Sequence, residues 1–279
     1  MPSVLVTGAA RGIGRATALR LAAAGWDVVA GVRRAEQGEA LAAAGGGRIA
    51  PVLLDVTDAD QVRALDDALP ARLDAVVNNA GIVVSGPVEG IGLGELRRQL
   101  EVNVVGQVAV TQAVLPRLRA SRGRVVFVSS LSGRVSTPMT GAYNASKFAV
   151  EGLADALRIE LRPWGMRVVL VEPAQTDTDM WRQADQSLDT SVAALSPAHR
   201  ELYARHIDGS RRMIPRSQRM ASPVDGVAAT IERALTAGRP KARYVVGAGP
   251  RAQAKLMQLT PTAARDALLR AATGVPRRL

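Results

Sequence analysis

Short apolar runs alternate with longer helical patterns from the first residues of the chain almost to its last. Seven runs have the apolar, β-branched composition of strands buried on both faces of a sheet, at residues 4–7, 27–32, 49–54, 74–77, 125–128, 167–172 and 243–246. Periodicity predicts helices between them, at residues 15–24, 35–44, 58–69, 93–119, 142–161 and 223–237. Such alternation predicts an α/β fold, a doubly wound parallel sheet with helices on both faces.

Length and composition favour one domain without a metal. The 279 residues are enough for one large α/β domain, and no linker-like stretch divides them, so we expect a single domain over residues 1–279. The absence of cysteine excludes disulfides, thiolate catalysis and zinc–sulfur sites. The two histidines, His199 and His206, lie in one polar, Arg-rich segment, which predicts surface residues rather than metal ligands.

The N-terminus and the net charge bear on location and partners. The chain starts directly with a strand pattern, which leaves no room for a signal peptide, and no apolar run approaches the ~18 residues of a membrane-spanning helix. We therefore expect a cytoplasmic protein without an integral membrane segment. A net charge of +11 is compatible with nucleic acid, a membrane surface or an anionic cofactor. Because the arginines are dispersed and only two Phe and three Tyr are present, we expect no nucleic-acid partner.

A glycine-rich loop joins the first predicted strand to the first predicted helix. Glycine lets the backbone approach a ligand closely, and a helix N-terminus offers free N–H groups and a positive dipole end to an anion. Such loops also make simple tight turns, but this one follows the first strand directly. We therefore predict a dinucleotide pyrophosphate site, with contacts from Gly8, Gly12, Ile13 and Gly14.

The second predicted strand ends in Val32-Arg33-Arg34. A dinucleotide fold that prefers NAD places an acidic residue here, on the ribose hydroxyl. No carboxylate is present to repel a 2′-phosphate, Arg33 and Arg34 follow the strand, and Arg11 in the glycine loop could approach the same phosphate. The sequence favours NADP over NAD, with the alternative that both consecutive arginines are solvated surface charges.

The fifth predicted strand ends in two hydroxyl residues, Ser129 and Ser130, and the helix pattern that follows carries Tyr143 and Lys147 one turn apart. A phenol titrates near pH ~10, so it is a poor base at neutral pH unless a nearby cation favours the phenolate. Lys147 is placed to be that cation. The phenol could then exchange a proton with an alcohol or a carbonyl while a hydride moves, and Ser130 would hold the reacting oxygen.

A Tyr with a Lys four residues later is also common as a solvated pair on a helix surface. The other tyrosines of this chain, Tyr203 and Tyr244, have Ile207 and Ala248 at the equivalent position. The Tyr–Lys spacing therefore does not recur at the other tyrosines of the chain. The strand that ends in hydroxyl residues just before it also favours a catalytic role.

Polar and small residues follow the third and fourth strands. The carboxylate of Asp55, with Val56, is expected to meet an adenine amino group, and small or amide side chains after residue 77 suit a backbone packed against a ligand, namely Asn79, Ala80 and Gly81. Asn103 lies within a helical pattern, where Asn is unfavourable, which indicates a specific hydrogen bond. A solvent-facing Asn is the alternative.

Two segments follow the sixth strand. Residues 179–222 have an irregular pattern rich in Ser, Arg and Met, and we expect them to form a mobile substrate lid, since they leave the sheet at a strand's carboxyl end. The alternative is a structural excursion that its apolar residues anchor to the core. Residues 250–272 predict one basic, amphipathic helix in a C-terminal tail that ends at residue 279.

Together these motifs resemble those of the short-chain dehydrogenase/reductase family, in the same order and along nearly the whole chain. The resemblance implies a Rossmann-like fold, a nicotinamide cofactor on the glycine loop, an adenine contact at Asp55-Val56 and a catalytic tetrad. The residues that match the tetrad are Asn103, Ser130, Tyr143 and Lys147. In the family, Tyr is the acid/base, Ser orients the substrate oxygen, Lys also binds the nicotinamide ribose, and Asn holds a water that links Lys to solvent.

The resemblance departs from the family pattern at one position. The family's Pro-Gly-x-x-x-Thr stretch appears here with Ala174 in place of glycine, whereas Thr178 matches the Thr that binds the nicotinamide carboxamide. Pro173, Thr176 and Thr178 are accordingly expected to contact the cofactor. Residues 143–152 are similar to the hydroxysteroid and retinol dehydrogenase branch, which acts on lipophilic alcohols and ketones.

The leading hypothesis is an NADP(H)-dependent oxidoreductase that interconverts a lipophilic alcohol and its ketone or aldehyde, with a homodimer or homotetramer as the expected assembly. A second hypothesis is an NADP-binding regulator without turnover, which the presence of all four tetrad residues disfavours. A third is nucleotide-sugar epimerisation, which is disfavoured because such relatives usually carry a larger C-terminal substrate domain.

Overall fold

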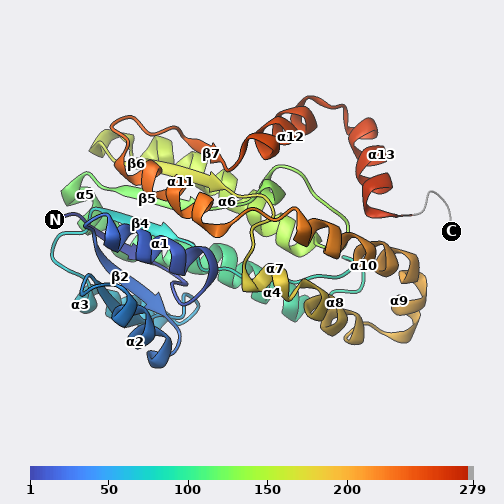
Figure 1. Cartoon of the computed structure of the whole chain (residues 1–279), viewed down its shortest axis with the longest axis horizontal. Coiled ribbons are helices and arrows are strands. Elements are labelled where there is room, and N and C mark those ends of the chain that lie inside the picture. The colour runs from blue at the N-terminus through green and yellow to red at the C-terminus, as the bar shows by residue number, and fades with distance from the viewer. Residues whose placement is uncertain (276–279) are drawn as a thin grey trace.

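The computed structural model describes residues 1–275 and contains one sheet of seven parallel strands in the order β3-β2-β1-β4-β5-β6-β7 (Figure 1). All seven predicted strands are present, with bounds within one residue of those expected: β1 (Ser3–Val6), β2 (Asp27–Val32), β3 (Ile49–Leu53), β4 (Ala75–Asn78), β5 (Arg124–Val128), β6 (Arg167–Glu172) and β7 (Arg243–Val245). The predicted α/β class, a Rossmann-like doubly wound sheet in a single domain, is confirmed.

Helices cover both faces of the sheet because alternate strand residues point to opposite sides. Val4 and Val6 of β1 pack in one core with α1 (Gly12–Ala23), α2 (Ala35–Ala44) and α11 (Val224–Thr236). Leu5, between them, packs in a second core with α3 (Ala59–Ala68), α5 (Gly106–Ser121) and α6 (Gly141–Glu160). Burial on both sides explains why the strands are continuous apolar runs in the sequence.

The order of the strands reverses between β1 and β4, which are neighbours in the sheet but far apart in the chain. Crevices at such a reversal, beyond the carboxyl ends of the strands, are where ligands bind in open α/β sheets. Here the loops after the two strands are joined. The Asn79 side-chain amide donates hydrogen bonds to the carbonyl oxygens of Thr7 (2.9 Å) and Gly8 (3.2 Å), and Thr7 Oγ1 accepts from the backbone N–H groups of Asn79 and Ala80.

The predicted helix over residues 93–119 is interrupted. α4 (Leu93–Leu100) and α5 are separated by a π-helical turn at Glu101–Val105, which contains Asn103. Single π turns inside helices are frequent at functional sites.

Residues 179–222, for which the sequence predicted no helix, are mostly helical: α7 (Asp179–Arg182), α8 (Ala184–Ala193), α9 (Pro197–Leu202) and α10 (Ala204–Arg219). Three of these helices have ten residues or fewer, so no long period is visible in the sequence. A small core formed by Met139, Leu188, Leu195 and Ile207 joins them to the loop before α6. In Figure 1 this segment lies at the end of the molecule opposite the N-terminus.

The predicted single tail helix is also wrong, since the structure has two helices, α12 (Ala248–Leu259) and α13 (Thr262–Thr273). Pro261 separates them, because proline disfavours a helical conformation in the residue before it and cannot donate a backbone hydrogen bond. Residues 276–279 of the predicted tail lie outside the described residues. Among the helices of residues 1–275, none has the length and apolarity needed to cross a bilayer.

Gly14 should be intolerant of a side chain, because a Cβ there would lie 2.3 Å from the Gly8 carbonyl oxygen and 2.5 Å from Asn79 Nδ2. We expect Gly14→Ala to lower the free energy of unfolding by about 1–3 kcal/mol, the usual cost of overpacking. Urea unfolding followed by circular dichroism measures this. Gly226→Ala in α11 is the matched control, since a Cβ there meets no atom within 4 Å, and it should stabilise by about 0.5 kcal/mol. Equal urea midpoints for Gly14→Ala and the wild type would contradict the packing of this loop.

Candidate active site

A cavity of about 1210 Å³ opens at the carboxyl ends of β1, β4, β5 and β6. Its walls include the glycine loop, the first residues of α6, the segment after β6, and parts of α7, α8 and α10. Almost all of the predicted site residues line it, although they come from separate parts of the chain: Gly8, Arg11, Gly12, Ile13, Arg33, Arg34, Asp55, Val56, Asn79, Ala80, Gly81, Ser130, Tyr143, Lys147, Pro173, Thr176 and Thr178. The two exceptions, Gly14 and Asn103, are buried behind the wall.

The N-terminus of α1 fits the phosphates of a dinucleotide. Arg11 is the N-cap residue, but no side chain caps the helix, and its first turn contains no acidic residue. Gly8 (φ +62°) and Gly12 (φ +54°) give the loop a conformation that other residues rarely adopt. The first N–H groups of α1 are therefore available to an anion, and the helix dipole favours negative charge at the same place.

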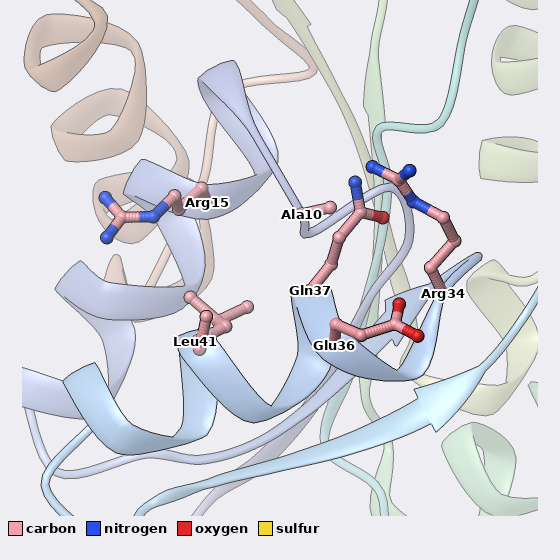
Figure 2. A pocket seen from close by; sticks show the side chains of 7 residues that line it. Ala10, Arg15, Arg34, Glu36, Gln37 and Leu41 are labelled. Atoms are coloured by element: carbon pink, nitrogen blue, oxygen red, sulfur yellow. The ribbon is translucent and has the colours of Figure 1, made fainter.

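Arginine side chains gather at the end of β2. Val32 is buried as the last residue of the strand, and the exposed Arg33 and Arg34 that follow both line the cavity. Arg34 also borders a second hollow of about 620 Å³, together with Gln37. Figure 2 shows the Arg34 and Gln37 side chains directed toward the loop that carries Ala10, whereas the Arg15 guanidinium points to the other side of α1.

Asp55 and the segment after β6 line the cavity, and several of their polar groups already form hydrogen bonds within the protein. One carboxylate oxygen of Asp55 accepts hydrogen bonds from the backbone N–H (3.0 Å) and hydroxyl (2.8 Å) of Thr57. The Thr176 hydroxyl donates to the Ala174 carbonyl at 3.0 Å. Thr178 lies against the glycine loop, because a Cβ on Gly12 would be 3.3 Å from its methyl group. The segment after β6 thus returns to the phosphate end of the cavity.

Lys147 is buried, and its ammonium donates a 2.8 Å hydrogen bond to the carbonyl oxygen of Val128, the last residue of β5. Its Nζ lies 5.7 Å from the centre of the Tyr143 ring. Burial lowers the pKa of Lys147 to about 8, and the Glu151 carboxylate opposes that change. The ammonium is therefore close to its titration range at neutral pH.

Tyr143 and Ser130 face each other across the same end of β5. Burial raises the pKa of Tyr143, and a hydrogen bond with Ser130 partly opposes this. Burial therefore outweighs other influences on this phenol, and the expected lowering of the Tyr143 pKa is not found, whereas the role of Lys147 beside the phenolate stays a prediction. Ser130 Oγ also accepts from the backbone N–H of Ser132 at 3.1 Å, whereas Ser129 is buried and its hydroxyl has no hydrogen-bond partner among the described residues.

Asn103 is buried rather than solvent-facing, so the alternative of a surface Asn is wrong. Its side-chain oxygen accepts from the backbone N–H of Ile82 (2.8 Å), and its amide donates to the Ile82 carbonyl (3.0 Å) and to Ser146 Oγ (3.1 Å). These bonds tie the segment after β4 to the residue before Lys147. The water-holding role that the family resemblance implies for Asn103 stays a prediction.

The sequence analysis missed an ion-pair network beside the site. Glu172, the last residue of β6, has a fully buried side chain that receives two hydrogen bonds from Arg134, which lines the cavity. Arg243 of β7 extends the network to Glu172 (3.5 Å) and to Glu151 (3.0 Å), one turn after Lys147. A glutamate at the end of the apolar run RVVLVE was the available signal, because a charge in a buried strand needs a partner.

This chain is similar in sequence to known proteins of one family. A family model described as short chain dehydrogenase matches residues 2–189. The NADPH-dependent 3-dehydrocapnine reductase of Ornithobacterium rhinotracheale is 34% identical over 88% of this chain and 88% of its own length. Retinol dehydrogenase 5 of Mus musculus is 33% identical over 88% of this chain and 80% of its own length.

Two solved structures of short-chain dehydrogenases share the fold. The one from Burkholderia cenocepacia J2315, in complex with NADP, has a TM-score of 0.74 and 26% identity over 99% of this chain and 98% of that chain. The one from Burkholderia phymatum, in complex with NAD, has a TM-score of 0.76 and 26% identity over 92% of each chain. With a family model that matches most of its length and relatives that align along most of theirs, this chain belongs to the short-chain dehydrogenase family of oxidoreductases.

Proposed function

We propose that the protein is an NADP(H)-dependent oxidoreductase that interconverts a primary or secondary alcohol and its aldehyde or ketone. One observation carries the proposal: the hydroxyls of Ser130 and Tyr143 and the ammonium of Lys147 line the same cavity as the uncapped N-terminus of α1. The phosphate end would hold the dinucleotide and the hydroxyl end the reacting carbon. The cofactor, when bound, supplies or accepts the hydride.

The residues of the chain would handle the proton and the oxygen. In the reduction, Ser130 donates a hydrogen bond to the substrate carbonyl, and Tyr143 gives its proton to that oxygen as the carbon receives the hydride. Lys147, anchored to the Val128 carbonyl, places a positive charge beside the phenol and so stabilises the phenolate that forms. In the oxidation, the same groups act in the reverse sense. Asn103 would position α6 through Ser146.

NADP is the proposed cofactor because three arginines line the cavity near the end of β2, namely Arg11, Arg33 and Arg34, and because no acidic residue directly follows the strand, where the sequence is Val32-Arg33-Arg34. A guanidinium binds a phosphate through paired, charge-assisted hydrogen bonds. One relative is named as NADPH-dependent and one related structure holds NADP. A second related structure holds NAD, so the fold alone does not decide the cofactor and the arginines carry the choice.

A lipophilic substrate is proposed because apolar side chains of α7 and α8 line the cavity, including Met180, Trp181 and Leu188. These helices would act as the substrate lid. Met and Trp offer adaptable or broad apolar surface to a bulky ligand. A retinol dehydrogenase and a 3-ketodihydrosphingosine reductase are among the relatives, which agrees with such a substrate.

The proposal includes a cytoplasmic homodimer or homotetramer. α6 exposes three large apolar side chains, Phe148, Leu153 and Ile159, and Val105 is half-exposed at the end of the π-helical turn before α5. Exposed apolar side chains grouped on helices favour contact with another protein surface.

Tyr143→Phe should abolish most turnover while leaving cofactor binding intact, because it removes the acid/base oxygen and leaves the phosphate site unchanged. We expect the rate of NADPH-dependent ketone reduction to fall about 10²–10⁴-fold, the usual contribution of a general acid. A panel of ketones followed at the nicotinamide absorbance identifies a substrate and then measures the loss. Tyr244→Phe, in β7, is the control and should keep the wild-type rate. A Tyr143→Phe enzyme that retains a tenth of the wild-type rate would show that Tyr143 is not the acid.

Replacement of Arg33 and Arg34 together by Ala should weaken NADP binding with little effect on NAD. Each charge-assisted contact contributes about 1.5–3 kcal/mol, so the Kd for NADP should rise by about tenfold or more. Isothermal titration calorimetry with both cofactors measures the change. Arg63→Ala is the control, since Arg63 is exposed on α3 and lines neither hollow. If the wild type binds NADP and NAD equally, the assignment of a 2′-phosphate site is wrong.

A further inference from the structure

Three helices outside the sheet, α10, α12 and α13, line one part of the cavity, which we call the compartment. Its apolar lining residues are Met213 and Ile214 of α10, Ala254 and Met257 of α12, and Leu269 of α13, and its polar ones are Ser210, Ser217, Gln253 and Thr273. α13 packs closely on α10, because a Cβ added to Gly209 would lie 2.4 Å from the Thr273 carbonyl oxygen. The C-terminal helices thus form part of the cavity wall.

The three helices direct their charges away from this compartment. They carry nine Arg and Lys residues between them, yet no charged side chain of α10, α12 or α13 is among the described residues that line the cavity. On α10 the cavity-lining residues are spaced as one helix face, at positions 210, 213, 214 and 217. A helix that is basic outside and neutral inside favours an uncharged ligand in the interior.

Adjacent residues of the tail lie in different environments, one in the cavity wall and the next exposed to solvent. Met257 and Leu269 line the cavity, whereas Leu256 and Leu268 beside them are 59% and 52% exposed. The apolar side chains of the compartment are aliphatic or thioether, since α10, α12 and α13 contain no Phe, Tyr or Trp. Flexible side chains of this kind adapt to a flexible chain rather than stack on a planar ring.

We propose that this compartment binds the alkyl chain of an aliphatic alcohol or ketone whose polar end reacts at Tyr143, and that Met257 and Leu269 limit the chain length. The proposal rests on the proposed function and names its substrate class as long-chain. Each methylene that enters the compartment leaves water, so kcat/KM should rise by about fourfold per methylene until the compartment is full.

The test is a homologous series of straight-chain 2-alkanones reduced with NADPH by the full-length protein. Met257→Trp and Leu269→Trp fill the compartment, so the rise of kcat/KM should stop at a shorter chain, while the shortest alkanone keeps its wild-type value. Leu256→Trp and Leu268→Trp introduce the same side chain at the adjacent exposed positions and should follow the wild-type series. If all four variants follow the wild-type series, or if all four lose the long chains equally, the subsite assignment is overturned.

A binding measurement separates this inference from the proposed activity. The Kd of a long-chain 2-alkanol is measured by calorimetry with NADPH bound, because the alcohol cannot be oxidised by the reduced cofactor. We expect Met257→Trp and Leu269→Trp to raise that Kd by about tenfold or more, a loss of two or more buried methylenes. A wild-type protein that reduces no alkanone but binds the alkanol in this way refutes the activity and keeps the subsite. A wild type that reduces short alkanones with no gain from added methylenes keeps the activity and refutes the subsite.

A variant that fails to fold is recognised by circular dichroism and replaced by Met257→Ala or Leu269→Ala. These enlarge the compartment and remove its contacts with the end of the chain. The gain in kcat/KM per methylene should then fall for the longest alkanones only, and an unchanged gain overturns the assignment of that residue.

Discussion

The hydrogen bond from the buried Lys147 ammonium to the Val128 carbonyl holds the reacting end of the molecule together. A buried cation is costly unless it is hydrogen-bonded, and this one donates to a carbonyl at the carboxyl end of β5. The bond fixes the first turns of α6 against the sheet, and Tyr143, one turn earlier, is thereby held over the cavity. The same burial lowers the pKa of Lys147 to about 8, so the sheet sets both the position and the charge of this side chain.

The position of the cavity follows from the strand order. β1 and β4 are adjacent, so the loops after them meet, and the Asn79 amide joins them by bonding to Thr7 and Gly8. Asn103 plays a similar part, because its side chain hydrogen-bonds both to the backbone of Ile82 and to the hydroxyl of Ser146. Both asparagines use their side chains on the backbone or on a neighbouring helix. They make the site rigid through contacts that lie beneath its surface.

Local patterns predicted the fold because burial on both faces leaves a clear signature. β2 and β6 begin and end at the expected residues, and α2 matches its predicted range. Interactions between residues far apart in the sequence could not be predicted from local patterns. Arg134 and Glu172 are 38 residues apart in the sequence, and Arg243 and Glu151 are 92 residues apart. No local sequence pattern predicts either ion pair. The direction of the Tyr143 pKa was predicted wrongly for the same reason, since it depends on burial that only the assembled cavity creates.

The pH dependence of kcat/KM for ketone reduction with NADPH tests the central claim, that a buried Lys147 cation supports proton donation by Tyr143. The pKa of Tyr143 is raised, so the phenol keeps its proton over the neutral and mildly alkaline range, whereas Lys147 carries its charge below a pKa of about 8 and loses it above. The account predicts a constant kcat/KM on the acidic side of pH 8 and a decline on the alkaline side. A value that stays constant until Tyr143 itself would titrate, above pH ~10, would contradict it.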